Sequence, residues 1–126
     1  MNKQIRKYLI SIARRKGIVH YQELCDHFNL NLNMRERPHD RKEIGRILGE
    51  ISTFEHNKDG RPLLSALVLS KSFEEGDGFF KLAEELGFGN WRRLKSGDIF
   101  QSQEMNRCYD YWQNESKYIK YVEDEN

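Results

Sequence analysis

Apolar residues recur at steps of three and four over most of this chain, and that spacing places them on one face of an α-helix. The segments with this pattern are 3–15, 21–28, 40–54, 79–86 and 99–122. Two shorter apolar stretches, 18–20 and 63–69, lack the pattern and favour β structure. The sequence therefore predicts a mostly helical α+β fold.

Local signals set the expected ends of these elements. Gly17 and Gly87 are expected to end two of the helices, and residues 57–60 (NKDG) are expected to form a turn. Asp40 is followed three residues later by Glu43, which is a variant of the capping box. That pair predicts that the third helix begins at Asp40.

The apolar faces of the predicted helices are expected to meet in a core. In segment 99–122 the apolar stripe includes Trp112, Ile119 and Val122, and we expect it to be core rather than a ligand surface. Cys25 and Cys108 do not form a C-x-x-C motif, so two reduced, buried thiols are expected. The residues expected to be buried together are Ile44, Leu48, Leu67, Phe79, Leu82 and Trp112.

The composition indicates a folded protein with a polar surface. The chain has 126 residues, the size of one domain. Charged residues make up 33% of it, which predicts a polar surface, and aromatic residues make up 12%, which favours a packed core over disorder. No apolar run reaches the roughly 18 residues of a membrane span, and the N-terminus is too charged for a secretory leader. We expect a cytoplasmic protein with no membrane partner.

The histidines do not have the spacing of a metal site, and no metal or cofactor is expected. One catalytic alternative is acid–base hydrolysis by His39-Asp40 together with Glu55-His56, which needs a fold that joins the two ends of one helix. A Gly-x-Gly motif at 76–78 could in principle hold a phosphate. It is interpreted as a turn, because the acidic residues around it repel anions.

The net charge of +1 hides an uneven distribution. Residues 1–19 carry six basic side chains and no acid, whereas residues 98–126 carry seven acids and three bases. Residues 35–46 carry five bases and three acids, and residues 91–95 add three bases. A basic face, which phosphate binding requires, is therefore compatible with a neutral total.

A further pattern is formed by four different segments in their order along the chain. They are residues 20–25 (HYQELC), 41–48 (RKEIGRIL), 61–68 (RPLLSALV) and 75–82 (EGDGFFKL). In this order they resemble the second helix, the recognition helix, the apolar segment and the glycine-aromatic turn in the DNA-binding domain of the O6-alkylguanine-DNA alkyltransferases and alkyltransferase-like proteins. The resemblance implies a winged-helix-like core over about 3–87 and a helical extension over about 88–122, within one domain of residues 1–126.

The sequence departs from that family at two positions that bear on function. The family's Pro-Cys-His-Arg motif is absent, and Ser65-Ala66 stands where the acceptor cysteine would fall, so alkyl transfer is not expected. Lys42 takes the place of the arginine that fills the gap left by a flipped base in the family. Lysine is a poorer wedge than arginine. The resemblance thus implies DNA binding without catalysis.

We therefore expect a non-catalytic nucleic-acid-binding protein whose third helix and a wing at 58–60 contact DNA. The candidate contact residues are Tyr21, Arg41, Lys42, Arg46, Lys58 and Arg61. Arg41, Lys42 and Arg46 lie off the apolar stripe and should be exposed, whereas Tyr21 is equally suited to the core. Residues 60–66 and 76–80 also resemble pieces of uncharacterised bacterial or phage proteins.

Two alternatives to nucleic-acid binding remain open. A protein-interaction module, such as an immunity, anti-defence or regulatory partner, is favoured by the near-zero net charge and the acidic, aromatic C-terminal segment. A small nuclease built on the two histidine-acid pairs is the remote alternative.

Overall fold

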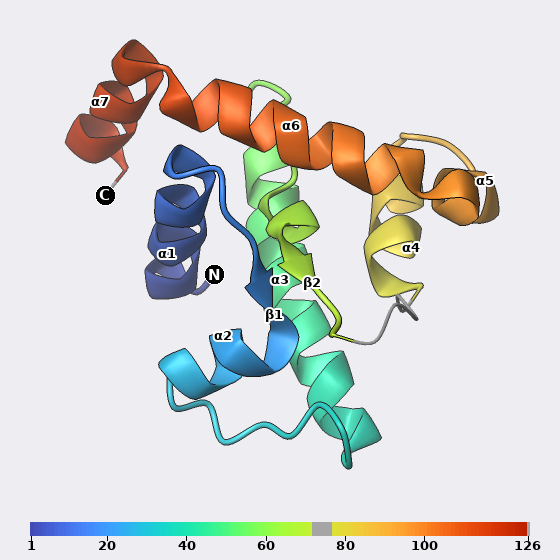
Figure 1. Ribbon diagram of the computed structural model, residues 1–126. Helices are drawn as coiled ribbons and strands as arrows, with labels where there is room; N and C mark the ends of the chain where they lie inside the picture. Colours follow the sequence, from blue (N-terminus) through green and yellow to red (C-terminus); the bar gives the residue numbers. More distant parts are fainter. Residues whose placement is uncertain (72–76, 126) are drawn as a thin grey trace.

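The computed structural model describes residues 1–71 and 77–125, and most of them are helical (Figure 1). The helices are α1 (Lys3–Arg14), α2 (Tyr21–His27), α3 (Pro38–Asn57), α4 (Gly78–Glu85), α5 (Trp91–Lys95), α6 (Ile99–Gln113) and α7 (Glu115–Asp124), with short 3-10 helices at Leu64–Leu67 and Ser96–Asp98. The predicted mostly helical α+β class is confirmed. Across the described ranges, no helix combines the length and apolar character that crossing a bilayer requires.

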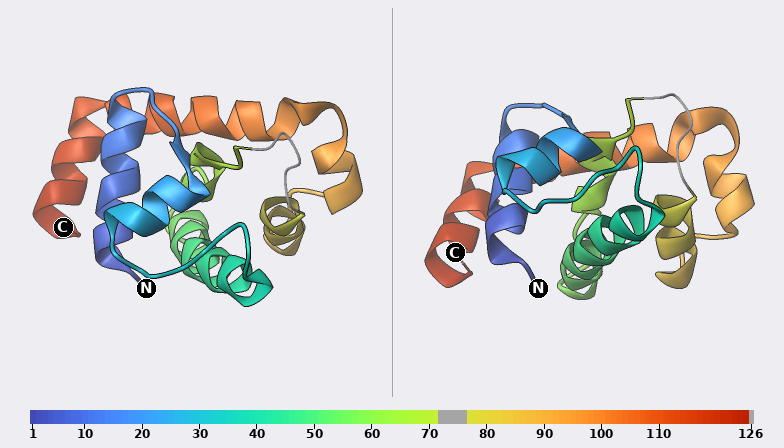
Figure 2. Two further views of the ribbon diagram at one scale, coloured as in Figure 1. Left: turned by 60° about the horizontal axis from the view of Figure 1, so that its bottom comes forward. Right: turned by 90° about the horizontal axis from the view of Figure 1, so that it is seen from below.

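α6 crosses the molecule and connects its two halves. α1 and α7 lie near one end of α6, α4 and α5 lie near the other, and α3 passes beneath its middle (Figure 1). α2 and the loop that follows it lie at the far end of α3, away from α6 (Figure 2). The N-terminal end of α3 therefore projects from the rest of the structure.

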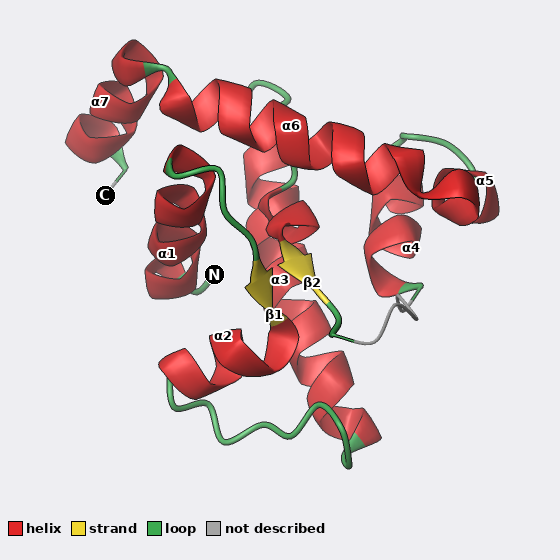
Figure 3. Ribbon diagram, viewed as in Figure 1, coloured by secondary structure: helices red, strands yellow, loops and turns green. Residues whose placement is uncertain are grey.

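The sheet has two short strands among the described residues. β1 (Val19–His20) pairs in parallel with β2 (Val68–Leu69), with Val19 opposite Val68 (Figure 3). The pairing is parallel because α2 and α3 carry the chain back to the same end before β2 begins. No strand follows β2 in the described part of the chain, and residues 58–60 lie directly after α3 rather than in a hairpin. The winged-helix architecture therefore stays a prediction.

The buried apolar residues form two clusters instead of the single core that we predicted. Ile44, Leu48, Leu67 and Trp112 belong to a larger cluster between α1, α3 and α6. Phe79 belongs to a smaller cluster, and Leu82 is only half-buried. The smaller cluster consists of Leu63, Ala66, Phe79, Phe80 and Ala83. The division arises because α4 and α5 pack under one end of α6, while α1 packs under the other.

Residues 63–69 do not form the predicted strand along their whole length. Leu64–Leu67 is a 3-10 helix, and only the last two residues pair with β1. Two side chains take the backbone donors that a longer strand would use. Glu104 Oε2 accepts the N–H of Leu63 at 3.0 Å, and Ser52 Oγ accepts the N–H of Ser65 at 3.0 Å.

The predicted C-terminal helix over 99–122 is wrong, because Asn114 divides it into α6 and α7. The Asn114 side chain caps α7 by accepting the N–H of Lys117 at 3.0 Å. Trp112 is fully buried as expected, but Ile119 and Val122 are 50% and 41% exposed. The break turns α7 away from the line of α6, so the stripe on these two residues no longer faces the core.

The predicted start of the third helix is wrong, whereas the predicted glycine after α4 is found. α3 begins at Pro38 in its first turn, with Arg37 at the N-cap, because proline needs no backbone donor there. Asp40 does not cap the helix; its Oδ2 accepts the N–H of Asn33 at 2.8 Å. Gly87 follows α4 with a φ of 93°, as expected for a glycine after a helix. The expected turn over 76–78 lies partly outside the described residues.

Candidate nucleic-acid surface

The six candidate contact residues lie at two separate places. α3 has 20 residues and is therefore about 30 Å long. Arg41, Lys42 and Arg46 lie in its N-terminal half, whereas Lys58 and Arg61 lie beyond its C-terminal end. Tyr21 begins α2 and packs half-buried against the larger cluster. The six candidate residues therefore do not lie on one flat surface.

Arg41 and Lys42 are both exposed, but only Lys42 is free of contacts. The Arg41 guanidinium donates to two carbonyl oxygens of the preceding loop, Met34 O at 2.5 Å and Arg35 O at 3.0 Å. These bonds leave its charge exposed and fix the loop against α3. Lys42 has no hydrogen bond or ion pair within the described part of the chain, so its ammonium is available to a ligand.

Arg46 is exposed as expected, but two acids compensate its charge. Its guanidinium donates to Glu43, with one contact of 2.6 Å, and to Glu50. The hydrogen bond from Arg46 lowers the pKa of the Glu43 carboxyl. Such exposed pairs are weak and can be exchanged for a phosphate, but the three groups together are negative. Arg46 is therefore the least favourable of the three helix residues for binding an anion.

Side chains from α2 shape the loop between α2 and α3. Gln22 accepts the N–H of Met34 and donates to Leu32 O, both at 2.9 Å. Asn33 Oδ1 accepts the N–H groups of Arg35 and Glu36, each at 3.0 Å. Asn29 and Asn31 adopt positive φ angles, which asparagine tolerates better than most residues. The asparagines clustered in residues 29–33 are a sequence signal for a loop at this place.

Arg35 and Arg37 are two exposed cations that our sequence interpretation missed as contacts. They stand in the loop directly before Lys42 and Arg41, and both are exposed. Arg37 lies 3.7 Å from Asp40, the closest approach of the two charged groups. The signal that could have found them was the count of five bases in residues 35–46.

At the other end of α3, Arg61 is buried and not on an exposed wing. Only 6% of it is exposed. Its guanidinium donates to Glu125 at 3.1 and 2.7 Å, and it lies 3.5 Å from Glu55. Lys58 Nζ also contacts Glu125, at 3.0 Å. Lys58 is thus exposed but paired and Arg61 is buried, and both contact Glu125, which is distant in sequence.

The residues considered for catalysis lie in unreactive surroundings. Ser65, at the position of the family's acceptor cysteine, is 5% exposed and shares a hydrogen bond of 2.7 Å with Ser52. Burial raises the pKa of the Cys25 thiol to about 11 and also raises that of Cys108. A buried thiol that remains protonated is a poor nucleophile.

The nuclease alternative requires His39-Asp40 and Glu55-His56 to meet. They stand at opposite ends of α3, about 24 Å apart along the helix axis. Asp40 is engaged with the loop, and Glu55 is fully buried. In residues 1–71 and 77–125, no three His, Cys, Asp or Glu side chains gather in a set that could hold a metal ion.

Comparisons of this chain with models of protein families, with curated proteins and with solved structures gave no match. The similarity to the alkyltransferase DNA-binding domain therefore stays a prediction that rests on the four sequence segments alone.

Proposed function

We propose that the protein binds nucleic acid, without catalysis, through the N-terminal end of α3. The surface concerned consists of four exposed cations, and we call it the α3-start surface. Its members are Arg35, Arg37, Arg41 and Lys42. The observation that carries the proposal is that these four exposed residues lie within the first five residues of α3 and the short stretch directly before it.

The electrostatics of this end favour phosphates. The N-terminus of a helix carries a partial positive charge, which adds to the charge of the side chains around it. Glu36 and Asp40 lie among the four cations in the sequence, and Asp40 is already engaged by the N–H of Asn33 and by Arg37. Phosphate contacts from several Lys and Arg supply most of the sequence-independent affinity for nucleic acid.

The shape of the surface also suits a groove. The end of α3 and its loop extend below the other helices in the view of Figure 1. The exposed face of α3 carries Gly45, and no atom lies within 4 Å of the position a Cβ would take there. A partner backbone can therefore approach this helix closely.

A charge-removal series tests the proposal. The variant R35Q/R37Q/K42Q removes three cations and leaves Arg41, which holds the loop, in place. We expect the dependence of duplex DNA binding on salt to weaken by about one unit for each cation that contacted a phosphate. The matched control K3Q/K7Q/R15Q removes three exposed cations from the N-terminal segment instead.

Fluorescence anisotropy with a labelled duplex, at several salt concentrations, measures both variants. We expect the α3 variant to bind the duplex more weakly than the parent does. The control variant should bind it as tightly as the parent. A parent that does not bind at low salt, or a control that loses as much affinity as the α3 variant, contradicts the proposal.

A second candidate function is a protein-interaction module, and α7 provides the observation for it. Ile119 and Val122 lie three residues apart on this helix and are half-exposed. An interface anchored on apolar side chains changes little with salt, in contrast to phosphate contacts. If a protein partner binds the parent at moderate salt but does not bind I119S/V122S, this function is favoured over the first.

A further inference from the structure

Three cations surround one carboxylate near the C-terminal end of the chain. Glu125, which follows α7, accepts hydrogen bonds from Arg6 at 3.3 Å and from Arg61 at 3.1 and 2.7 Å. Lys58 Nζ lies 3.0 Å from the same carboxylate. The three cations come from α1, from the residue after α3 and from the loop beyond it. We call Arg6, Lys58 and Arg61 the basic triad.

The triad has more positive charge than its acids compensate. Besides Glu125, only Glu55 lies in contact with it, through Arg6 at 2.5 Å and Arg61 at 3.5 Å. Three cations therefore face two acids among the residues that the structure describes. Arg61 Nε is buried and has no hydrogen-bond partner there. Without Glu125 the net positive charge of the triad and its acids would rise by one. Buried charges without a partner are costly.

α7, which brings Glu125 to the triad, has few apolar contacts of its own. Tyr121 is its single buried residue, and it packs on Trp112 with ring centroids 5.4 Å apart. Arg14 also contacts this helix, pairing with Glu115 at 2.6 Å and lying over the ring of Tyr118 at 3.8 Å. Charged contacts thus contribute a large share of what holds α7, and these weaken when a competing anion is present.

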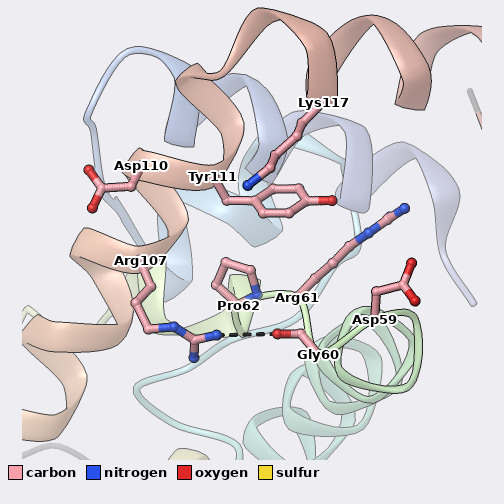
Figure 4. A pocket seen from close by; sticks show the side chains of 8 residues that line it. All are labelled: Asp59, Gly60, Arg61, Pro62, Arg107, Asp110, Tyr111 and Lys117. Atoms are coloured by element: carbon pink, nitrogen blue, oxygen red, sulfur yellow. Dashed lines mark hydrogen bonds between the residues drawn. The ribbon is translucent and has the colours of Figure 1, made fainter.

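The triad continues into an open hollow of about 360 Å³ (Figure 4). Of the triad, Arg61 lines this hollow, together with the cations Arg107 and Lys117 and the acids Asp59 and Asp110. Lys117 Nζ lies 4.5 Å from the centre of the Tyr111 ring, and Arg107 donates to Gly60 O at 3.2 Å. Arg107 belongs to α6, so it stays beside the triad when α7 moves, and it also pairs with Glu104. Lys117 belongs to α7 and moves with it.

We propose that Glu125 takes the place of a nucleic-acid phosphate, so that α7 covers a second contact site built from the basic triad. Nucleic acid that binds at the triad displaces Glu125 and releases α7. The inference rests on the proposed function and adds regulation to it: the α3-start surface is always open, whereas the triad opens only in competition with α7. It also explains why two of the candidate contacts, the exposed Lys58 and the buried Arg61, both pair with Glu125.

Hydrogen exchange on the full-length parent chain gives the first test. With duplex DNA at low salt, we expect slower exchange at the start of α3 and faster exchange in α7. This measurement needs no substitution, so it does not depend on how a variant folds. Protection at α3 with unchanged exchange in α7 overturns the inference and leaves the proposed function standing.

Substitution of the carboxylate gives the second test. E125Q keeps the size and an acceptor oxygen but removes the charge, and we expect it to bind duplex DNA about two- to fivefold more tightly than the parent, the factor that one screened charge contributes. The control E123Q removes an exposed acid from the same helix. The double variant E125Q/K58Q should lose most of the gain, because it removes the phosphate contact that E125Q opens.

The outcomes separate the two proposals. Equal affinities of E125Q and E123Q overturn the inference alone. Binding by E125Q but not by the parent supports the inference and contradicts the α3-start surface. No binding by the parent or by E125Q at low salt overturns both.

Discussion

At the scale of single residues, opposing effects act on the ionisation of Glu125. Burial opposes its ionisation, but hydrogen bonds from Arg61 and Lys58 outweigh burial and lower its pKa from 4.5 to about 2. Because the folded-state pKa lies below the unfolded one, the ionised carboxylate stabilises the fold above pH 4.5. That contribution is lost as the pH falls from 4.5 towards 2.

We therefore expect the parent to exceed E125Q in free energy of unfolding at neutral pH, and the difference to shrink as the pH falls below 4.5. Urea unfolding followed by tryptophan fluorescence, at a series of pH values, measures it. A difference that stays constant down to pH 3 would show that the charge of Glu125 does not stabilise the fold.

Residue exposure could be predicted where it depends on local pattern and not where it depends on distant partners. Lys42 and Arg46 lie off the apolar stripe of α3, and both are exposed as predicted. Arg61 was predicted to contact nucleic acid beside the wing, but it is buried and pairs with Glu55 and Glu125. A sequence does not show that residues 61 and 125 meet, so neither the triad nor its acid could be predicted.

Among the elements, α3 contains a glycine that lowers the stability of the fold. Gly45 lies in the interior of this helix, with open space where a Cβ would stand. Gly45→Ala should raise the free energy of unfolding by about 0.5–1 kcal/mol, because alanine loses less backbone entropy on folding. Gly87→Ala is the control: its φ of 93° makes the same change destabilising. Urea unfolding compares them, and a G45A chain no more stable than the parent contradicts the expectation.

Helices with their own periodicity and end signals could be predicted from the sequence. α1, α2 and α4 lie within one or two residues of the predicted ranges. The break at Asn114 could not, since apolar residues continue at helical spacing across it. The five-residue helix α5 was missed because it is too short to show a period, although Asn90 caps it by accepting the N–H groups of Arg92 and Arg93.

In the molecule as a whole, the two clusters should differ in stability. The smaller cluster has five buried residues, whereas the larger one joins α1, α3 and α6. Regions with fewer buried apolar contacts open at lower free energy. Phe80→Ala should cost about 3–5 kcal/mol in the smaller cluster and accelerate exchange in α4 much more than in α1. Native-state hydrogen exchange measures this, and equal acceleration in both helices would show a single cooperative unit.

The pairing of β1 with β2 has a consequence for the order of folding. Val19 and Val68 stand opposite each other, with α2 and α3 lying between them along the chain. Closing so long a loop costs entropy that two short strands cannot offset, unless the intervening chain is already ordered. When α3 docks on α1, the unordered chain between the two strands becomes shorter. The strands therefore pair late, once most of the native topology has formed, and their pairing does not nucleate folding.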